Sequence, residues 1–377
     1  MILGIDASNI RAGGGVTHLS EVLRAATPDR YGFKQVALWS GRSTLDKIED
    51  RPWLLKLSDP LLDGSLPQRI YWQRFKLRPT AQAAGCDVLF VPGGSDASGF
   101  RPMVTMNQNL LPFEWHELLR YGWSAMTVKF ALLRFTQAAT FRRADGLIYL
   151  SGYARDVVGR FIRGRRPLET TIAHGIHPRF FMAPRPVRRI EDCDASQPMR
   201  ILYVSIVDVY KHQWHVAEAV AQLRAAGLPV ALDLVGPAGF ATPRLQATLK
   251  KVDPSGQSIR YLGAIPYEQL HQMYTSTDIA VFASSCETFG QILTEAMAAG
   301  LPVACSRRAA MPELLGDAGE YFDPEQPAEI AAALRRLIDS PALRAKMAAA
   351  HARAQSFSWE KCAEETFQFL AHASRVR

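Results

Sequence analysis

The sequence predicts an α/β protein made of two doubly wound halves that are joined by a linker. The chain has 377 residues, which is more than one hydrophobic core of ordinary size holds. In both halves, short apolar runs alternate with helical patterns, as in parallel sheets with crossover helices. Between the halves, residues 181–198 are polar, contain proline and show no periodicity, which is typical of an inter-domain linker.

The first half contains six apolar runs that we expect to be strands. They are Met1–Asp6, Gln35–Trp39, Asp87–Val91, Val104–Asn107, Gly146–Leu150 and Thr170–Ala173. A triple-glycine loop follows the first run, and the pattern then predicts a helix over Val16–Ala25. A longer helix is expected over Glu117–Arg143.

The second half repeats this alternation. Expected strands are Arg200–Ser205, Val230–Val235, Ile259–Leu262, Ile279–Ala283 and Pro302–Ser306. Expected helices are Gln213–Ala226, Leu245–Val252, Tyr267–Thr275, Gly290–Ala299, Ala328–Asp339, Leu343–Gln355 and Trp359–Ala373, the last of them capped by Ser358. Ligands of such sheets bind at the carboxyl ends of the strands, so the loops there are the candidate sites.

Composition narrows the class of protein. Hydrophobic residues make up 48% and charged residues 21%, as in ordinary globular enzymes, and no apolar run is long enough for a membrane-spanning helix. The first ten residues lack the pattern of a secretory signal, so a cytoplasmic location is expected. Five scattered cysteines without a C-x-x-C pair argue against a disulfide framework or a cysteine zinc site.

The positive charge is unevenly distributed. Residues 1–180 hold 24 Lys and Arg against 15 Asp and Glu, so the whole excess of the chain lies there. This favours an anionic partner and general solubility about equally. Residues 118–144 contain no acid but five basic and five aromatic residues, which suits either a peripheral helix on the inner face of an anionic membrane or a core-packed helix with a basic outer face. No nucleic-acid-binding module is recognisable, so nucleic acid is not an expected partner.

The most specific local signal is a pair of glutamates, Glu287 and Glu295, separated by seven residues. Glu287 follows the expected strand Ile279–Ala283, and Gly290 opens the next helix. Free backbone N–H groups around Gly290 and Gln291 would form an anion site at that helix start. Because carboxylates accept hydrogen bonds from vicinal hydroxyls, sugars and ribose are natural partners of the two acids.

At this string the sequence resembles the retaining family 4 glycosyltransferases, whose GT-B fold has two Rossmann-like domains facing each other across a cleft. The matching residues are Glu287, Phe289, Gly290, Glu295, Ala296, Met297, Ala298, Gly300, Pro302 and Val303. The resemblance covers most of the second half and, more weakly, the first. It implies that Glu287 contacts the hydroxyls of a donor sugar and that Glu295 binds the ribose of its nucleotide. It also implies that the amides of Phe289, Gly290, Gln291 and Ile292 approach the sugar and diphosphate.

A second candidate element is the stretch from Ser205 to Lys211, at the carboxyl end of the expected strand Arg200–Ser205. A lysine there can place its charge on a diphosphate, and stabilising the charge of a leaving diphosphate is a large catalytic effect. The resemblance assigns Lys211 this role, next to Ser205. The family pattern also has an arginine nearby, but Ile206 stands in its aligned place.

Two elements of the first half resemble family loops. Gly14 and Gly15 begin a G-G-V string that faces the donor diphosphate in family members. The string is neither a dinucleotide-binding fingerprint nor a Walker A motif, which argues against nicotinamide enzymes and ATPases. Many members carry a His-Asp pair where this chain has Gln108 and Asn109. Amides can contact a sugar or acceptor hydroxyl but cannot act as bases near neutral pH.

No metal or other cofactor is expected. The string Asp192-Cys193-Asp194 has the form of a metal-binding D-x-D, but it lies in the polar linker and follows no apolar strand. We interpret it as solvated. No other acidic or histidine cluster has the spacing of metal ligands.

Together these observations predict a glycosyltransferase that uses a nucleotide-diphosphate-sugar and retains the anomeric configuration. We expect an acceptor-binding domain over 1–180, a linker over 181–198, a nucleotide-sugar-binding domain over 199–357, and a helix over 358–377 that crosses back to the first domain. The acceptor would be a polysaccharide or lipid-linked glycan precursor, as in lipopolysaccharide pathways. Alternatives are a nucleotide-sugar epimerase, a glycogen-type synthase or phosphorylase, and a catalytically silent nucleotide-sugar-binding subunit.

Overall fold

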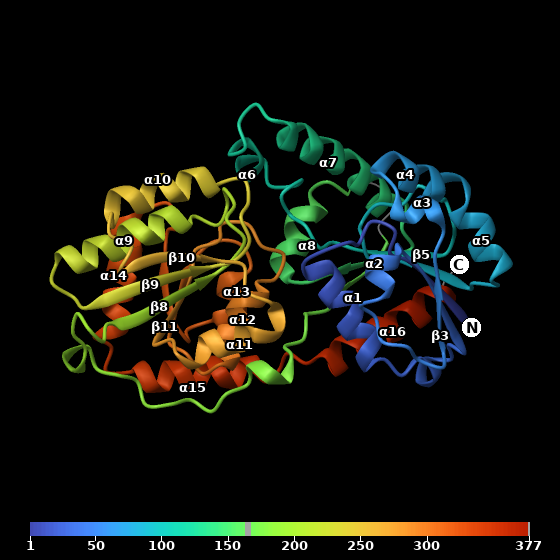
Figure 1. Cartoon of the computed structure of the whole chain (residues 1–377). Coiled ribbons are helices and arrows are strands. Elements are labelled where there is room, and N and C mark those ends of the chain that lie inside the picture. The colour runs from blue at the N-terminus through green and yellow to red at the C-terminus, as the bar shows by residue number, and fades with distance from the viewer. Residues whose placement is uncertain (163–166, 376–377) are drawn as a thin grey trace. The chain divides into compact units, whose positions relative to one another are not determined.

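The computed structural model describes residues 1–162 and 167–375 of the chain. They form two compact units (Figure 1). Unit 1 consists of Met1–Leu118, Trp123–Gly175 and the C-terminal segment from Ser358. Unit 2 consists of Ile176–Phe357 and, in addition, Leu119–Gly122. Each unit has its own sheet and its own core, which is the pattern that the alternation of elements predicts.

Unit 1 is built on a seven-stranded parallel sheet with the order β3-β2-β1-β4-β5-β6-β7. The strands are β1 (Ile2–Asp6), β2 (Gln35–Trp39), β3 (Leu54–Leu57), β4 (Val88–Val91), β5 (Met103–Met106), β6 (Gly146–Tyr149) and β7 (Leu168–Thr171). The helices are α1 (Gly14–Ala25), α2 (Arg42–Leu45), α3 (Pro60–Asp63), α4 (Leu66–Phe75), α5 (Leu77–Ala83), α6 (Trp115–Leu119), α7 (Ala125–Arg143), α8 (Gly152–Gly159) and α16 (Trp359–Arg375). The central strands β4, β5 and β6 are buried throughout, as helix layers on both faces of a parallel sheet require.

Unit 2 has a six-stranded parallel sheet with the order β10-β9-β8-β11-β12-β13. The strands are β8 (Met199–Val204), β9 (Val230–Val235), β10 (Ile259–Gly263), β11 (Ile279–Phe282), β12 (Val303–Ser306) and β13 (Glu320–Phe322). The helices are α9 (Gln213–Ala225), α10 (Thr242–Val252), α11 (Tyr267–Thr275), α12 (Gln291–Ala298), α13 (Met311–Leu315), α14 (Pro327–Ile338) and α15 (Leu343–Ala354). Figure 1 shows α9 and α10 on one face of this sheet and α12 and α15 on the other.

In both sheets the first three strands are added toward one edge of the sheet, and the later strands are added toward the other edge. In unit 1 this reversal lies between the neighbouring strands β1 and β4, and in unit 2 between β8 and β11. The loops that leave two such strands turn to opposite faces of the sheet, which opens a crevice at their carboxyl ends. The fold therefore marks one candidate ligand position in each unit.

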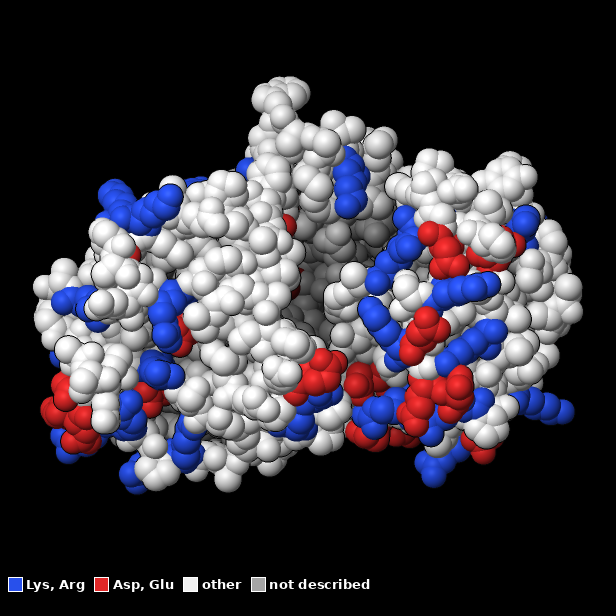
Figure 2. All heavy atoms as spheres, in the orientation of Figure 1, with Lys and Arg blue, Asp and Glu red and all other residues white. Residues whose placement is uncertain are grey.

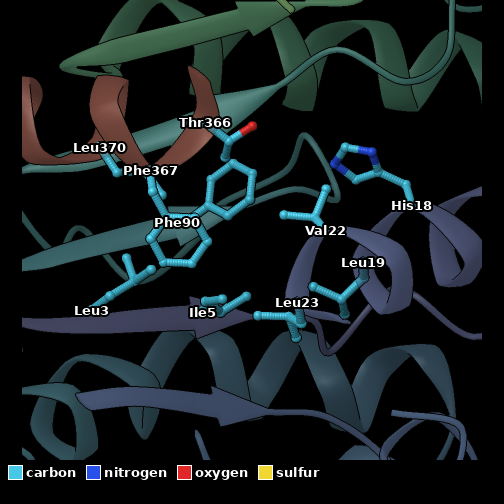
Figure 3. A pocket seen from close by; sticks show the side chains of 10 residues that line it. All are labelled: Leu3, Ile5, His18, Leu19, Val22, Leu23, Phe90, Thr366, Phe367 and Leu370. Atoms are coloured by element: carbon cyan, nitrogen blue, oxygen red, sulfur yellow. The ribbon is translucent and has the colours of Figure 1, made fainter. Parts of the chain in front are cut away.

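The C-terminal helix α16 completes the core of unit 1. Ser358 caps it as predicted, because its hydroxyl accepts a hydrogen bond from the amide of Lys361 at 3.1 Å. Figure 3 shows apolar side chains of α1, β1, β4 and α16 lining a small pocket, with His18 at its margin. His18 is buried with its Nδ1 2.9 Å from that of His174, and burial lowers the pKa of His18 to about 4. Both rings pack on Trp359, so His174 belongs to the core.

The structure corrects the predicted elements of unit 1 in two places. The helix expected over Glu117–Arg143 is divided into α6 and α7, because Gly122 has a positive φ of 59° and Ser124 caps the start of α7. The triple-glycine loop is shorter than expected, since Gly14 and Gly15 are already the first residues of α1 and only Gly13 (φ 66°) lies outside the helix.

Residues 181–198, predicted as a linker, are grouped with unit 2. The guanidinium of Arg185 donates to the carbonyl of Tyr274 at 2.7 Å, and the amide of Met182 donates to the carbonyl of Ala298 at 3.1 Å. Asp192 and Asp194 of the D-x-D string are exposed. In the two described ranges, no group of three or more His, Cys, Asp or Glu could hold a metal ion. Among the same residues, no helix is both long and apolar enough to cross a bilayer.

Close packing at the carboxyl edge of unit 2 yields a first prediction. Gly236 has φ 146°, and a Cβ placed there would lie 2.0 Å from the carbonyl oxygen of Ser205. Gly236→Ala must therefore displace the loop after β8 and should lower the free energy of unfolding by at least about 2 kcal/mol in urea titrations. The control is Gly159→Ala in α8, where a Cβ meets nothing within 4 Å. Equal stability of the two variants would contradict the packing described.

Candidate active site

The loop between β11 and α12 carries Glu287 to the carboxyl edge of the unit 2 sheet. Gly290 ends the loop with φ 113° and is the N-cap of α12, which begins at Gln291. The positive φ favours glycine, and a Cβ there would also press on the Met311 side chain at 3.1 Å. Helix N-termini carry a partial positive charge, so the start of α12 places such a charge beside Glu287.

Lys211 reaches Glu287 from the neighbouring loop between β8 and α9. Its ammonium forms an ion pair with the Glu287 carboxylate. Only 9% of the lysine side chain and 18% of the glutamate side chain are exposed. The structure thus brings together the two residues that the sequence proposes as catalytic, although they are 76 positions apart. The pairing neutralises both charges where solvent is scarce.

The Lys211 loop is fixed by its neighbours. The hydroxyl of Tyr203 donates to the backbone carbonyl of Lys211 at 2.6 Å. His212 has a positive φ of 53°, and its Nε2 lies 2.9 Å from the hydroxyl of Ser285, in the loop after β11. The amide of Ser285 in turn donates to the carbonyl of Tyr210 at 2.8 Å. The two loops that carry Lys211 and Glu287 therefore form one connected structure, which holds the pair in place.

Glu295 lies deeper than Glu287. It is fully buried on α12, and its Oε1 accepts a hydrogen bond from the Tyr267 hydroxyl at 3.0 Å. Burial raises its pKa to about 8, although hydrogen bonds from Tyr267 and Gln291 and the charge of Arg179 act in the opposite direction. Sequence reasoning missed Tyr267 and Arg179. The hydrogen bond from Tyr267 and the influence of the Arg179 charge depend on how α11 and the turn Pro178–Phe180 pack on α12, and no spacing in the sequence signals either.

The remaining predicted residues of unit 2 lie around this edge. Phe289 is buried, whereas Gln291 and Ile292 at the start of α12 are partly exposed. Ser205 follows β8 and is 8% exposed, and its hydroxyl donates to the carbonyl of Ile206 at 3.1 Å. Ile206 itself is 40% exposed, so an apolar side chain faces solvent where the resemblance would place an arginine.

Two other arginines approach the Lys211 loop within unit 2. Arg120 and Arg308 both bind the carboxylate of Glu325, at 2.6 Å and 2.8 Å. Hydrogen bonding from Arg120 is the main cause that lowers the pKa of Glu325 to about 2. Burial is the main cause that lowers the pKa of His212 to about 3, and the charge of Arg120 is the next. His212 is thus neutral near pH 7 and serves to hold the loop rather than to carry charge.

The candidate residues of unit 1 lie at the edge of its own sheet. Gly14 and Gly15 form the N-terminus of α1, where amides lack intrahelical acceptors. The side-chain oxygen of Gln108, after β5, would be 3.5 Å from a Cβ at Gly15, so the two are neighbours. The side-chain oxygen of Asn109 accepts from the amide of Leu111 at 3.0 Å and shapes the turn. A cleft that joins these residues to Lys211 and Glu287 stays a prediction.

Comparison with known proteins identifies the domain that carries the ion pair. Residues 194–354 match the family model described as "Glycosyl transferases group 1". This part of the chain is therefore similar to the family. The matched range includes Lys211, Glu287 and Glu295, as the resemblance of the glutamate string predicts.

Two curated glycosyltransferases are similar to parts of the chain. The chain is 40% identical over 109 residues to O-antigen chain mannosyltransferase B of Escherichia coli, covering 29% of each chain. It is 29% identical over 233 residues to the GDP-mannose-dependent alpha-(1-6)-phosphatidylinositol dimannoside mannosyltransferase of Mycobacterium tuberculosis, covering 61% of this chain and 58% of that one. The chain therefore matches less than two thirds of the length of these two glycosyltransferases.

A solved structure resembles the whole chain. Sucrose-phosphate synthase from Thermosynechococcus elongatus aligns over 98% of both chains with a TM-score of 0.76 and 19% sequence identity. At this identity the likeness shows the fold alone. It confirms the predicted GT-B fold of two Rossmann-like units.

The buried Glu295 generates a prediction about pH. Because its pKa is about 8 in the folded chain and 4.5 when unperturbed, the folded state binds more protons than the unfolded state between these values. Stability should therefore fall as pH rises through this window. Glu295→Gln should remove this decline, and its gain over the wild type between pH 5 and pH 8 should be on the order of 2–4 kcal/mol in urea unfolding.

Glu325→Gln is the matched control for this experiment. The pKa of Glu325 is lowered to about 2, so its contribution to stability is complete above the unperturbed value of 4.5 and is lost only at lower pH. This variant should change the stability at pH 5 and at pH 8 by the same amount. If the free energy of unfolding of Glu295→Gln fell with pH as steeply as that of the wild type, Glu295 would be charged in the folded protein.

Proposed function

We propose that this protein is a glycosyltransferase that moves a sugar from a nucleotide-diphosphate-sugar to an acceptor with retention of configuration. The observation that carries the proposal is the Lys211–Glu287 ion pair beside the N-terminus of α12. It places a cation, a hydroxyl-binding carboxylate and an anion-binding helix start at one edge of the domain that matches the family. These are the groups that a diphosphate-linked sugar requires.

Each group has a role in the proposed reaction. Lys211 leaves Glu287 for the donor diphosphate, and the carboxylate that it releases orients the sugar hydroxyls. The bond from the anomeric carbon to the diphosphate oxygen breaks while the acceptor oxygen bonds to the same face of that carbon. The acceptor proton passes to the leaving phosphate oxygen. Lys211 and the α12 amides stabilise the charge that builds on the diphosphate, and Glu295 holds the ribose.

This route needs neither a protein base nor a metal ion. Gln108 cannot accept a proton near neutral pH, but the phosphate of the donor can. Lys211 supplies the positive charge that a divalent cation would otherwise bring to the diphosphate. The names of both relatives specify mannosyl transfer, and one name specifies GDP-mannose. They support a nucleotide-hexose donor and a polysaccharide or lipid-linked acceptor for this chain.

A silent nucleotide-sugar-binding subunit is the second candidate. Ile206 favours it, because an exposed isoleucine stands where the resemblance implies an arginine on the diphosphate. Such a subunit would bind the donor with Glu295 and the α12 amides but release no nucleotide with any acceptor extract. An epimerase on the same fold would instead convert the nucleotide sugar without acceptor.

Substitutions at the two ends of the donor site test the proposal. Lys211→Ala should lower kcat by about 100-fold or more with a smaller change in donor affinity, since its charge acts mainly on the leaving group. Glu295→Ala should weaken donor binding instead. Nucleotide release and thermal shift with a panel of nucleotide sugars measure both effects. Lys251→Ala, in α10, is the control for lost surface charge. Wild-type kinetics in the first two variants would disprove the assigned site.

We also propose that unit 1 binds the surface of an anionic membrane through α7. Val128, Leu132 and Phe135 lie on one stripe of this helix and are between 61% and 71% exposed. Trp123, just before the helix, is fully exposed, and the exposed Lys129 lies beside the stripe. Figure 2 shows the projecting part at the top of the view, over α7, without acidic side chains. An apolar stripe with basic neighbours fits lipid tails below anionic headgroups.

Vesicle binding tests this surface. Leu132→Ser together with Phe135→Ser should weaken co-sedimentation with phosphatidylglycerol vesicles by roughly 10- to 100-fold, because two apolar side chains no longer enter the interface. Leu262→Ser, on β10 of unit 2, removes an exposed apolar side chain elsewhere and should not change binding. Equal binding of both variants, or equal binding of the wild type to neutral phosphatidylcholine, would contradict the proposal.

A further inference from the structure

The crevice between β1 and β4 of unit 1 carries a group of polar side chains to which no role has been assigned. It is the position where the strand order of this sheet reverses, and ligands of open parallel sheets bind at such positions. Three segments meet there: the loop after β1, the loop after β4, and α4. Gln73 of α4 connects them, since its side chain donates to the Asp6 carboxylate at 2.5 Å and to the Ser95 carbonyl at 2.9 Å.

Several polar atoms in this crevice are buried without a protein partner. Within residues 1–162 and 167–375, the Ser8 hydroxyl, the Asn9 side-chain oxygen, the Ser95 hydroxyl and Arg69 Nε have no hydrogen bond. Ser8 is only 1% exposed. A buried polar atom without a partner costs on the order of 1–3 kcal/mol, so such groups occur mainly where water or a ligand completes them. Their clustering at the sheet reversal points to a ligand.

Two arginines give the crevice its charge. Arg69 of α4 donates from one nitrogen to the carbonyl of Ser8 at 3.3 Å, and Arg11 in the loop after β1 donates to the carbonyl of Gly64 at 3.2 Å. Neither is in an ion pair with any described residue. Arg69 contacts the carbonyl of Ser8, three residues before Arg11, so both arginines belong to the same part of unit 1. In keeping with this, burial, and then the positive charge of Arg11, lower the pKa of Arg69. An oxyanion between them would compensate both positive charges.

The acidic groups nearby are occupied with the protein itself. Asp6 accepts hydrogen bonds from Gln73 and from the amide of Ser8, and burial raises its pKa. Asp96 accepts from the hydroxyl and amide of Ser98. Both carboxylates are at least nine-tenths buried and are fixed by these bonds. The guanidiniums are therefore the groups with unused donors.

We propose that the crevice between β1 and β4 is a binding site for a phosphate group on a hydroxyl-bearing molecule, held by Arg11 and Arg69. The planar guanidiniums bind the phosphate oxygens in pairs, and Ser8, Asn9 and Ser95 complete their hydrogen bonds with the hydroxyls. The inference deepens the proposed function, because it assigns a phosphate-bearing acceptor to unit 1. A soluble phosphate ester and a lipid headgroup share this chemistry.

The test is isothermal titration of the full chain with inorganic phosphate and with glycerol 3-phosphate. Arg69→Gln and Arg11→Gln should each weaken binding of both probes at least tenfold. Arg78→Gln, an exposed arginine on α5 with no described partner, is the control for net charge and should bind as the wild type does. Lys211→Ala should also retain binding, since any phosphate on the donor edge of unit 2 depends on that lysine.

The outcomes separate this site from the donor site. Loss of glycerol 3-phosphate binding in Arg69→Gln, with unchanged thermal shift by nucleotide diphosphates, supports the site even if the chain transfers no sugar. Binding confined to phosphatidylglycerol vesicles and lost in Arg69→Gln identifies a lipid headgroup as the source of the phosphate. Wild-type affinity in both arginine variants, or equal losses in Arg78→Gln, overturns the proposal. The proposal is also overturned if the arginine variants lose only nucleotide binding, because the arginines would then bind the donor.

Discussion

The ion pair between Lys211 and Glu287 is the constraint around which unit 2 is organised. It can form only because β8 and β11, which are far apart in sequence, are neighbours in the sheet. The hydrogen bonds of Tyr203, His212 and Ser285 then hold the two loops together. A misplacement of either loop would leave a nearly buried charge without a partner, which typically costs about 3–5 kcal/mol. The geometry of the site is therefore tied to the stability of the fold.

The same pair explains how a charged site can exist before its ligand arrives. Removing two opposite charges from water is unfavourable, and their mutual attraction offsets much of that cost. Glu295 avoids a buried charge in another way. Burial raises its pKa to about 8, so the carboxyl stays protonated and neutral below that pH. The charge of Glu287 is thus compensated by Lys211, whereas Glu295 accepts a hydrogen bond from the Tyr267 hydroxyl.

The sequence predicted the buried framework better than its periphery. Central strands such as β2 and β9 have the predicted bounds, because an apolar run that is buried on both faces is a strong signal. The edge strands β3 and β13 were missed, since they are short and only partly buried. The glutamate string predicted the positions of Glu287, Gly290 and Glu295 in the structure, because all three lie in one loop and the helix that follows it. Tyr267 could not be predicted, since its contact with Glu295 depends on the packing of α11.

The two units carry different charges at the same topological position. In unit 2 the reversal between β8 and β11 holds one lysine, which a glutamate already neutralises. In unit 1 the reversal between β1 and β4 holds two arginines without a carboxylate partner among the described residues, while Asp6 and Asp96 are fixed by hydrogen bonds. A neutralised site suits a ligand that must bind, react and leave. An uncompensated pair suits an oxyanion that is only held, and this difference in charge is the physical basis for placing the reacting diphosphate on unit 2 and a phosphate of the acceptor on unit 1.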